Sequence, residues 1–294
     1  MEPRPPEIPN SEALSFLRII TGSFARPAGE NPTVAMVEAA YRHHSINACY
    51  INCEVAPDAL ADAVRGARAM GWAGFNCSIP HKVAVVPMLD SLARSASIIG
   101  AVNCVVVRDG ALVGENTDGQ GFIRAMHGQR DPSGQDVVVL GAGGAARAIA
   151  IELALAGATC ITVVNRDQGR GSELARLISN STSAESRFVV WDKTYRVRAS
   201  TTVLVNATPV GLFPDVAAMP DVELDTLKPG MLVADVIPNP PRTRLLAAAE
   251  ERGCITLDGL GMLVEQGVLG IAMWTGVNTD PRVMRRALVD ALKI

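Results

Sequence analysis

The chain has 294 residues, of which 48% are hydrophobic and 19% are charged, and its formal net charge is −3. A chain of this length exceeds what one hydrophobic core usually serves, so we expect two domains. The near-neutral charge gives no electrostatic basis for binding nucleic acid or an anionic membrane. The sequence has neither an unbroken run of about 18 apolar residues nor an apolar leader, so we expect a cytoplasmic globular protein.

The six cysteines are scattered and lie mostly inside apolar segments. Cys49 and Cys53 are spaced C-x-x-x-C, and the sequence contains no C-x-x-C motif or paired His/Cys set of the kind that binds zinc. We therefore expect reduced core thiols and no metal site.

The N-terminal part of the chain predicts a mixed α/β unit. Pro32 stands at a favoured first position of a helix with Asn31 as its N-cap, and Gly71 ends the next helix. The Asp109-Gly110 pair is typical of a hairpin turn. The expected elements are a disordered tail over 1–10, strands over 16–20, 49–55 and 74–79, helices over 32–42 and 58–70, and hairpin strands over 104–107 and 111–113.

From residue 135 onward, strands and helices alternate, which predicts a doubly wound parallel sheet. The expected strands are 137–140, 160–164, 187–191, 202–206, 231–237 and 254–257, and the expected helices are 170–178, 243–252, 262–274 and 281–292. A helix expected over 119–127 and the loop over 128–134 cross from the first domain into this one. No strand accompanies the last two helices, so we expect them to return to the first domain.

The expected fold is therefore α/β with two domains. We expect an N-terminal mixed-sheet domain for substrate binding and catalysis over 11–125 and 265–294. A doubly wound Rossmann domain that binds a dinucleotide is expected over 126–264. The cleft between two such domains is the default ligand site.

A glycine-rich turn marks the dinucleotide site. The β-branched run 137–140 enters the turn, and an alanine-rich helix leaves it. Gly141 permits the tight turn, Gly143 lets the backbone approach a ligand, and the small Ala146 allows close packing of helix on sheet. The free N–H groups of a helix N-terminus suit a pyrophosphate. With the strand 160–164 completing a βαβ unit, this segment predicts a dinucleotide site, and a methyltransferase loop is a weaker alternative.

The end of the second Rossmann strand favours NADP over NAD. An NAD site needs a carboxylate here for the ribose 2′-OH, whereas this chain has Asn165. Arg166 and Arg170 follow, and a helix that begins between them would turn both guanidinium groups toward a 2′-phosphate. Asp167 would repel that phosphate unless it pairs with an arginine or caps the helix. The alternative for Arg170 is a solvated helix residue.

Two polar clusters in the first domain are hard to explain as folding devices. One covers 76–82 at the end of a buried strand, and the other covers 114–119 where the hairpin ends. Polar residues at the carboxyl end of a strand are where α/β folds place ligands.

These segments and several others resemble the shikimate dehydrogenase family, including its quinate and aminoshikimate relatives, over nearly the whole chain. The resembling segments are 76–82 (N-x-[ST]-x-P-x-K), 100–103 (G-A-V-N), 116–119 (N-T-D-G), 141–148 (G-A-G-G-A-x-R-A), 165–166 (N-R), 206–211 (N-A-T-x-x-G) and 258–266 (D-G-x-x-M-L-x-x-Q). The resemblance implies two α/β domains and oxidation of a ring hydroxyl in a cyclic polyol carboxylate by NADP⁺.

Carried over by position, Lys82 and Asp118 are the catalytic pair. Alcohol oxidation needs a group that handles the hydroxyl proton, and a lysine oriented by a carboxylate suits that task. The alternatives are a solvated lysine and a helix N-cap. The resemblance implies substrate contacts from Asn31, Thr33, Ser78, Asn103 and Gln266, and cofactor contacts from Gly141, Gly143, Gly144, Ala145, Asn165, Arg166, Arg170, Thr208 and Gly259. His81 receives no role.

Two departures from the family bear on the substrate. The family's S-x-S-P segment grips a ring carboxylate, but here Gly29 and Asn31 stand near the two serine positions. Asn31, Thr33 and Arg26 are the remaining groups that could hold a carboxylate. Pro238 stands where the family usually has a tyrosine that contacts substrate, and proline has no hydroxyl.

The first expectation is an NADP-dependent shikimate dehydrogenase of the chorismate pathway of aromatic amino acid biosynthesis. The alternatives are a dehydrogenase of quinate, aminoshikimate or another cyclic polyol carboxylate and, outside enzymes, a non-catalytic NADP(H)-binding regulator. We expect a small-molecule substrate, no nucleic-acid or membrane partner, and a monomer or homodimer.

Overall fold

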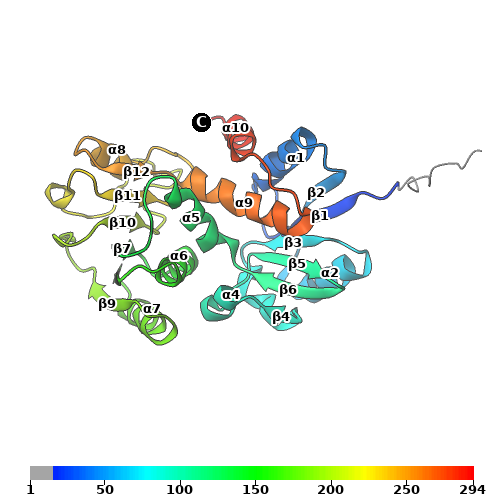
Figure 1. Ribbon diagram of the computed structural model, residues 1–294, viewed down its shortest axis with the longest axis horizontal. Helices are drawn as coiled ribbons and strands as arrows, with labels where there is room; N and C mark the ends of the chain where they lie inside the picture. The colour runs from blue at the N-terminus through cyan, green and yellow to red at the C-terminus, as the bar shows by residue number, and fades with distance from the viewer. Residues whose placement is uncertain (1–15) are drawn as a thin grey trace, which may run out of the picture.

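The computed structural model describes residues 16–294 and contains two six-stranded sheets, which lie side by side in Figure 1. We call the parts around them the N-terminal lobe, with strands between residues 19 and 115, and the Rossmann lobe, with strands between 136 and 257. The tail expected over residues 1–10 lies outside the described residues.

The sheet of the N-terminal lobe is mixed, as expected, with strand order β2-β1-β3-β5-β6-β4. Strands β1, β2 and β3 run parallel, β5 pairs antiparallel with both β3 and β6, and β4 joins β6 in parallel. The strands are β1 (Ile19–Ala25), β2 (Ala48–Glu54), β3 (Gly74–Cys77), β4 (Ser91–Leu92), β5 (Cys104–Arg108) and β6 (Ala111–Glu115). The hairpin around Asp109 is confirmed.

The first strand differs from the expectation of 16–20, since β1 begins at Ile19 and continues to Ala25. The small polar residues Thr21 and Ser23 resemble a turn in sequence, yet both are fully buried in the strand. The hydroxyl of Thr21 donates to the Cys49 carbonyl, and that of Ser23 donates to Asn52. Hydrogen bonds to the neighbouring strand thus allow polar side chains in the sheet interior.

Four helices surround this sheet: α1 (Thr33–His43), α2 (Leu60–Ala69), α3 (His81–Ala84) and α4 (Arg94–Ile99). The short helices α3 and α4 were not expected. The N-cap of α1 is Pro32, one residue later than expected, although the Asn31 side chain still accepts a hydrogen bond from the Thr33 amide at 3.1 Å. Gly71 follows α2 with a φ of +68°, a conformation that suits glycine.

The Rossmann lobe has the expected doubly wound parallel sheet, with strand order β12-β11-β10-β7-β8-β9. Its strands are β7 (Asp136–Leu140), β8 (Cys160–Asn165), β9 (Glu185–Val190), β10 (Val203–Asn206), β11 (Leu232–Asp235) and β12 (Ile255–Leu257), and its helices are α6 (Gly144–Leu155), α7 (Gln168–Ser181) and α8 (Arg244–Glu250). The chain order reverses between β7 and β10, and ligands bind at such a switch point in open α/β sheets.

Two helices connect the lobes, α5 (Thr117–His127) and α9 (Gly259–Thr275), and the last helix, α10 (Pro281–Leu292), follows α9. Helices α5 and α9 cross the middle of the molecule and pack along each other, while α10 packs on α1 in the N-terminal lobe (Figure 1). The C-terminal helices therefore return to the first lobe, as expected. The expected domain limits at 125/126 and 264/265 fall inside α5 and α9.

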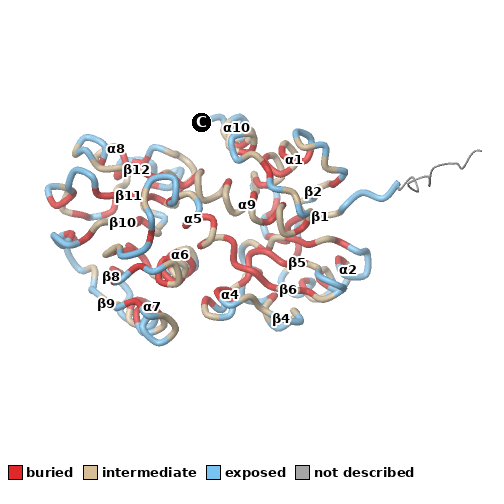
Figure 2. Tube along the Cα trace, viewed as in Figure 1, coloured by how far each residue is buried: buried red, intermediate tan, exposed pale blue. Residues whose placement is uncertain are grey.

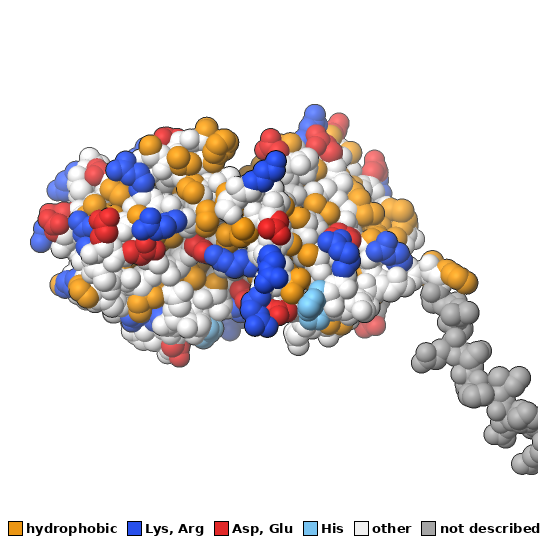
Figure 3. All heavy atoms as spheres, turned by 90° about the horizontal axis from the view of Figure 1, so that it is seen from above, with side chains coloured by type: hydrophobic (Ala, Val, Ile, Leu, Met, Phe, Trp, Pro, Cys, Tyr) orange, Lys and Arg blue, Asp and Glu red, His pale blue; other side chains and the backbone are white. Residues whose placement is uncertain are grey.

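The core of each lobe lies around its sheet, where buried residues concentrate in Figure 2. Packing is close at Gly74, where an added Cβ would lie 2.3 Å from the Val105 carbonyl oxygen and from the Trp274 ring. All six cysteines are free. On the face in Figure 3, acidic and basic side chains are intermingled, in keeping with the small net charge. Within residues 16–294, no helix is long and apolar enough to cross a membrane.

Candidate active site

The two residues expected to be catalytic form an ion pair. Lys82 lies in α3, immediately after β3, and Asp118 lies in the first turn of α5. Lys82 Nζ donates to Asp118 Oδ2 at 2.7 Å. The Lys82 side chain is 35% exposed and that of Asp118 is 15% exposed, so the pair is partly desolvated while the ammonium group remains accessible to a ligand.

Asn103 joins this pair to helix α9. Its buried amide nitrogen lies 2.8 Å from Asp118 Oδ1 and 3.0 Å from Gln266 Oε1. The amide oxygen of Asn103 accepts a hydrogen bond from the Thr117 backbone at 2.7 Å. Each carboxylate oxygen of Asp118 is thus held by a different donor, Lys82 or Asn103. Four residues that the sequence places in separate motifs form one network, which we call the Lys82 network (Lys82, Asp118, Asn103 and Gln266).

The residues expected to hold a substrate carboxylate lie outside the Lys82 network, and Asn31 is hydrogen-bonded to protein groups of its own. Asn31 donates to Ser23 Oγ at 3.2 Å, and Ser23 donates to Asn52 Oδ1 at 2.8 Å. Asn52 in turn donates to the Asn31 carbonyl at 3.0 Å, so these three side chains satisfy one another. Thr33 is 6% exposed at the start of α1. Ser78 is half-buried just after β3, on the same segment as Lys82.

The loop around Gly29, which stands where the family has its serine segment, is hydrogen-bonded to a carboxylate. Glu54, at the end of β2, accepts a hydrogen bond from the Ala28 amide at 3.0 Å. Gly29 and Arg26 in the same loop are exposed, and Pro238 in the other lobe is half-buried. The loop is therefore tied to an anionic side chain beside the position where the family has its first serine.

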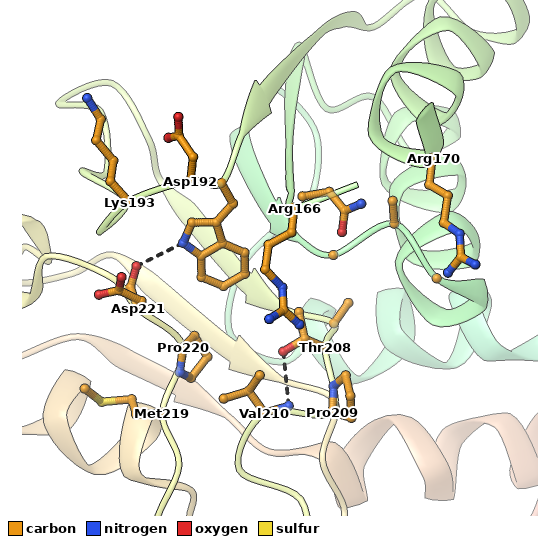
Figure 4. A pocket seen from close by; sticks show the side chains of 16 residues that line it. Arg166, Arg170, Asp192, Lys193, Thr208, Pro209, Val210, Met219, Pro220 and Asp221 are labelled. Atoms are coloured by element: carbon orange, nitrogen blue, oxygen red, sulfur yellow. Dashed lines mark hydrogen bonds between the residues drawn. The ribbon is translucent and has the colours of Figure 1, made fainter. Parts of the chain in front are cut away.

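A cavity of about 550 Å³ lies at the carboxyl ends of β7, β8, β9 and β10 (Figure 4). Gly141 lines it with a φ of +106°, and a Cβ there would lie 3.0 Å from the Ala207 carbonyl oxygen. Six of the residues expected to bind cofactor line this cavity: Gly141, Gly143, Asn165, Arg166, Arg170 and Thr208. Gly144 lines an adjoining recess that also contains Gly143 and Arg170.

Two expected cofactor residues line neither cavity. Ala145 lies within the first turn of α6. Gly259 begins α9, and a Cβ there would lie 2.4 Å from the Ile237 carbonyl oxygen, so its lack of a side chain serves packing between α9 and the segment after β11. Both assignments remain untested predictions.

The arginine pair has the arrangement that the sequence predicts. Helix α7 begins at Gln168, between Arg166 and Arg170, and both arginines line the cavity (Figure 4). The Asp167 side chain caps α7, with Oδ1 accepting from the Arg170 amide at 3.0 Å and Oδ2 lying 3.6 Å from Arg170 Nε. The carboxylate that would repel a 2′-phosphate is therefore occupied as a helix cap and in an ion pair.

Sequence reasoning missed part of the cavity wall. The additional lining residues are Ala142, Trp191, Asp192, Lys193, Ala207, Pro209, Val210, Met219, Pro220 and Asp221. Trp191 could have been found, because it directly follows the strand next to β8 in a doubly wound sheet. The lining residues that flank the expected ones, Ala142, Ala207, Pro209 and Val210, belong to the motif segments 141–148 and 206–211, and the rest lie on loops whose course the sequence did not predict.

A series of buried hydrogen bonds holds Thr208 in position at the cavity wall. Asn206 Oδ1 accepts hydrogen bonds from the Thr208 amide at 3.1 Å and from its hydroxyl at 2.7 Å. The amide nitrogen of Asn206 donates to both carboxylate oxygens of Asp235 at 3.1 Å. Thr243 and the Ile237 amide also donate to that carboxylate. Burial raises the pKa of Asp235 to about 6, and these hydrogen bonds oppose the rise.

Comparison with known proteins places these features in a family. Models of the shikimate dehydrogenase substrate-binding domain, of shikimate/quinate 5-dehydrogenase and of the shikimate 5′-dehydrogenase C-terminal domain match residues 24–105, 125–209 and 259–289. Shikimate dehydrogenase (NADP⁺) of Desulforamulus reducens is 41% identical over 273 residues, which are 92% of this chain and 94% of the relative. The chain belongs to the shikimate dehydrogenase family. The expected resemblance is thereby confirmed.

Solved structures agree with this membership. The ligand-free 5-ketofructose reductase of Gluconobacter sp. strain CHM43 is 53% identical and superposes with a TM-score of 0.92, covering 94% of this chain and all of the other. Shikimate 5-dehydrogenase of Thermus thermophilus, in complex with NADP(H) and shikimate, is 32% identical with a TM-score of 0.81, covering 93% of this chain and 99% of the other. Both share the two-lobed fold.

Family membership supports the expected enzyme class, an oxidoreductase with a Rossmann domain, and NADP as its dinucleotide. The names of the curated relatives favour shikimate over the expected alternatives quinate and aminoshikimate.

Proposed function

We propose that this protein interconverts shikimate and 3-dehydroshikimate by hydride transfer to and from NADP(H), a step of aromatic amino acid biosynthesis. The observation that carries the proposal is the Lys82 network, in which a lysine, a carboxylate and two amides from four distant segments meet. An isolated surface lysine would need none of these partners. Amides can both donate to and accept from a substrate hydroxyl, which suits Asn103 and Gln266.

Lys82 is the proposed proton-transfer group. In oxidation, the alcohol loses a hydride from its carbon and a proton from its oxygen, and neutral Lys82 takes that proton to become an ammonium group. In reduction, the ammonium group of Lys82 returns the proton to the carbonyl oxygen. Asp118 orients Nζ through its 2.7 Å hydrogen bond and stabilises the protonated form. Asn31, Thr33, Ser78, Asn103 and Gln266 remain the proposed substrate contacts.

The Rossmann-lobe cavity is the proposed NADP(H) site, and bound NADP⁺ supplies the hydride acceptor. Its wall fits that group, because a Cβ on Gly143 would meet no protein atom within 4 Å, leaving an open approach to the backbone. The N-terminus of α6 would hold the pyrophosphate, and Arg166 and Arg170 would hold the 2′-phosphate. Asn165 and Thr208 line the same wall.

We place substrate binding in residues 11–125 and 265–294 and NADP(H) binding in 126–264. The proposed setting is the cytoplasm, with a small-molecule partner and a monomeric or homodimeric state. The six free cysteines support a reducing compartment. Acidic and basic side chains are intermingled on the face drawn in Figure 3, and the net charge of −3 gives no electrostatic basis for binding a nucleic acid.

The direct test is steady-state kinetics with shikimate and NADP⁺, followed by NADPH absorbance. Lys82→Met should lower kcat by roughly 10²- to 10⁴-fold with cofactor affinity unchanged. Lys228→Met is the matched control, since Lys228 contacts only the Ala199 carbonyl at 3.2 Å among the side-chain hydrogen bonds found within residues 16–294. Equal activity of the two variants would refute the proposed role of Lys82. Tight NADP(H) binding without turnover of any cyclic or ketose substrate would favour the non-catalytic regulator.

A second candidate is reduction of 5-ketofructose, a neutral ketose. The 53% identity to a 5-ketofructose reductase favours it. The substrate loop favours it too, because Gly29 and Asn31 replace the carboxylate-binding serines, and Glu54 holds the loop with an anionic side chain. A fixed carboxylate beside a substrate carboxylate would weaken binding by like-charge repulsion.

The two candidates are separated by kcat/KM for NADPH-dependent reduction of 3-dehydroshikimate and of 5-ketofructose by the same preparation. A ratio of roughly tenfold or more in favour of 5-ketofructose would replace the first candidate with the second. Quinate and an aminoshikimate belong in the same panel. Substituting Glu54 by Gln should raise activity toward the carboxylate substrate and leave activity toward the neutral ketose unchanged, because only the former experiences the charge.

A further inference from the structure

One aromatic residue at the cofactor cavity has no role in the proposed chemistry. The chain has three tryptophans, and two of them, Trp72 and Trp274, are 6% and 7% exposed in the core of the N-terminal lobe. Trp191 instead lies half-buried in the Rossmann lobe and lines the cavity of about 550 Å³ (Figure 4). A large aromatic ring at a cavity wall offers a flat apolar surface to a ligand.

The orientation of the Trp191 ring is fixed by its own polar group. Trp191 Nε1 donates to the Asp221 carbonyl at 3.1 Å, and the Trp191 amide donates to the Asn165 carbonyl at 3.0 Å. The indole N–H is therefore satisfied by the protein. The Trp191 side chain and the Arg166 side chain line the same cavity.

Strand register brings Trp191 and Arg166 together. In the parallel pair β8–β9, Asn165 lies opposite Val190, so the next residues along the two strands, Arg166 and Trp191, leave the sheet side by side. Both residues follow the carboxyl ends of their strands, where doubly wound sheets bind nucleotides.

The same register locates the adenosine half of a dinucleotide. With the pyrophosphate at the glycine-rich turn after β7 and the 2′-phosphate at the arginines after β8, the base extends toward the next strand in the sheet, β9. The first side chain after β9 is Trp191. We infer that Trp191 stacks on the adenine ring of the dinucleotide, with the Arg166 guanidinium on the opposite side of the base.

This inference rests on the proposed NADP(H) function and deepens it, because it assigns the adenine subsite to a residue outside the glycine-rich and arginine motifs. Substitution of an aromatic side chain by alanine removes its stacking on a base. The stacked adenine lies at the other end of the cofactor from the reacting nicotinamide ring. Trp191 is therefore expected to affect cofactor KM and to leave kcat unchanged at saturating cofactor.

The test uses 2′,5′-ADP, which carries the adenine and both phosphates of the adenosine half but no nicotinamide. Titration should quench part of the tryptophan emission, and the quenching should disappear in Trp191→Phe, because Trp72 and Trp274 are buried in the other lobe. Calorimetry should show a Kd for 2′,5′-ADP that is roughly 5- to 100-fold higher in Trp191→Ala. The increase should be much smaller in Trp191→Phe, which keeps a ring that can stack.

The phenylalanine variant separates stacking from a structural role. Both variants lose the hydrogen bond to Asp221, so a structural role predicts that both weaken binding equally. That result, or a Kd in Trp191→Ala within twofold of the wild type, would overturn the inference. Failure of the wild-type protein to bind 2′,5′-ADP at all would overturn the proposed NADP(H) function, and this inference with it. Thermal unfolding of each variant checks that the fold is retained.

Discussion

The buried carboxylate beneath Thr208 makes a sharp prediction about stability. Asp235 is 1% exposed, and burial raises its pKa from 3.8 to about 6. At about pH 3 and below, the group is protonated in both the folded and the unfolded protein and contributes almost no penalty. Above pH 6 the folded protein must hold it ionised, which costs free energy that the unfolded chain does not pay. A shift of this size corresponds to about 3 kcal/mol, at about 1.4 kcal/mol per pH unit.

The perturbation is Asp235→Asn, which removes the titration and retains an oxygen that can accept from Asn206. The wild-type free energy of unfolding should fall by about 3 kcal/mol more than that of the variant as the pH rises from about 3 to 7. Any fixed cost of the substitution, such as a poorer contact with Thr243, is the same at both pH values and cancels. Urea denaturation of the full chain at each pH gives the required values.

Asp215→Asn is the matched control, because it makes the same chemical change on an exposed loop of the same lobe. It should follow the wild-type pH dependence. If Asp235→Asn also follows that dependence within about 1 kcal/mol, the carboxylate is not held in the desolvated state described here, and the reasoning fails.

Three further outcomes are expected. Asp118→Asn should lower kcat by roughly 10²-fold or more, because the neighbouring lysine loses its charged partner, and initial rates at saturating substrates check this. Replacing Arg166 and Arg170 by Ala should raise the KM for NADP⁺ by roughly 10- to 100-fold and leave that for NAD⁺ unchanged; equal effects on both cofactors would argue against a 2′-phosphate contact. Gly143→Ala should unfold like the wild type but bind NADP⁺ poorly. Gly74→Ala, whose Cβ would meet a backbone oxygen at 2.3 Å, should instead lose about 1–3 kcal/mol of stability in urea denaturation.

Much of the fold is predictable because its signals are local. Alternating strands and helices, the glycine-rich turn after β7 and the Asp109-Gly110 hairpin turn each act within a few residues. The elements that the sequence did not predict at all are short. Helix α3 spans only His81–Ala84, which is too short to show an apolar period, and β4 has two residues that depend entirely on pairing with β6.

The site was predictable to a lesser degree. Lys82 and Asp118 could be assigned through their motifs, but the bond that joins Asn103 to Gln266 spans 163 residues of sequence and depends on the packing of α9 on α5. The position of Trp191 depends on the register between β8 and β9, which no single-strand pattern contains. Contacts set by register and by helix packing are tertiary properties.

The closeness of α5 and α9 has a mechanical consequence for the whole enzyme. At Gly121 in α5, an added Cβ would lie 2.7 Å from the backbone nitrogen of Gln266 in α9, so the two helices touch through their main chains. Asp118 is less than one turn before that contact. The main-chain contact between α5 and α9 therefore fixes the spacing between Asp118 and Gln266, and a bulkier residue at position 121 would change that spacing.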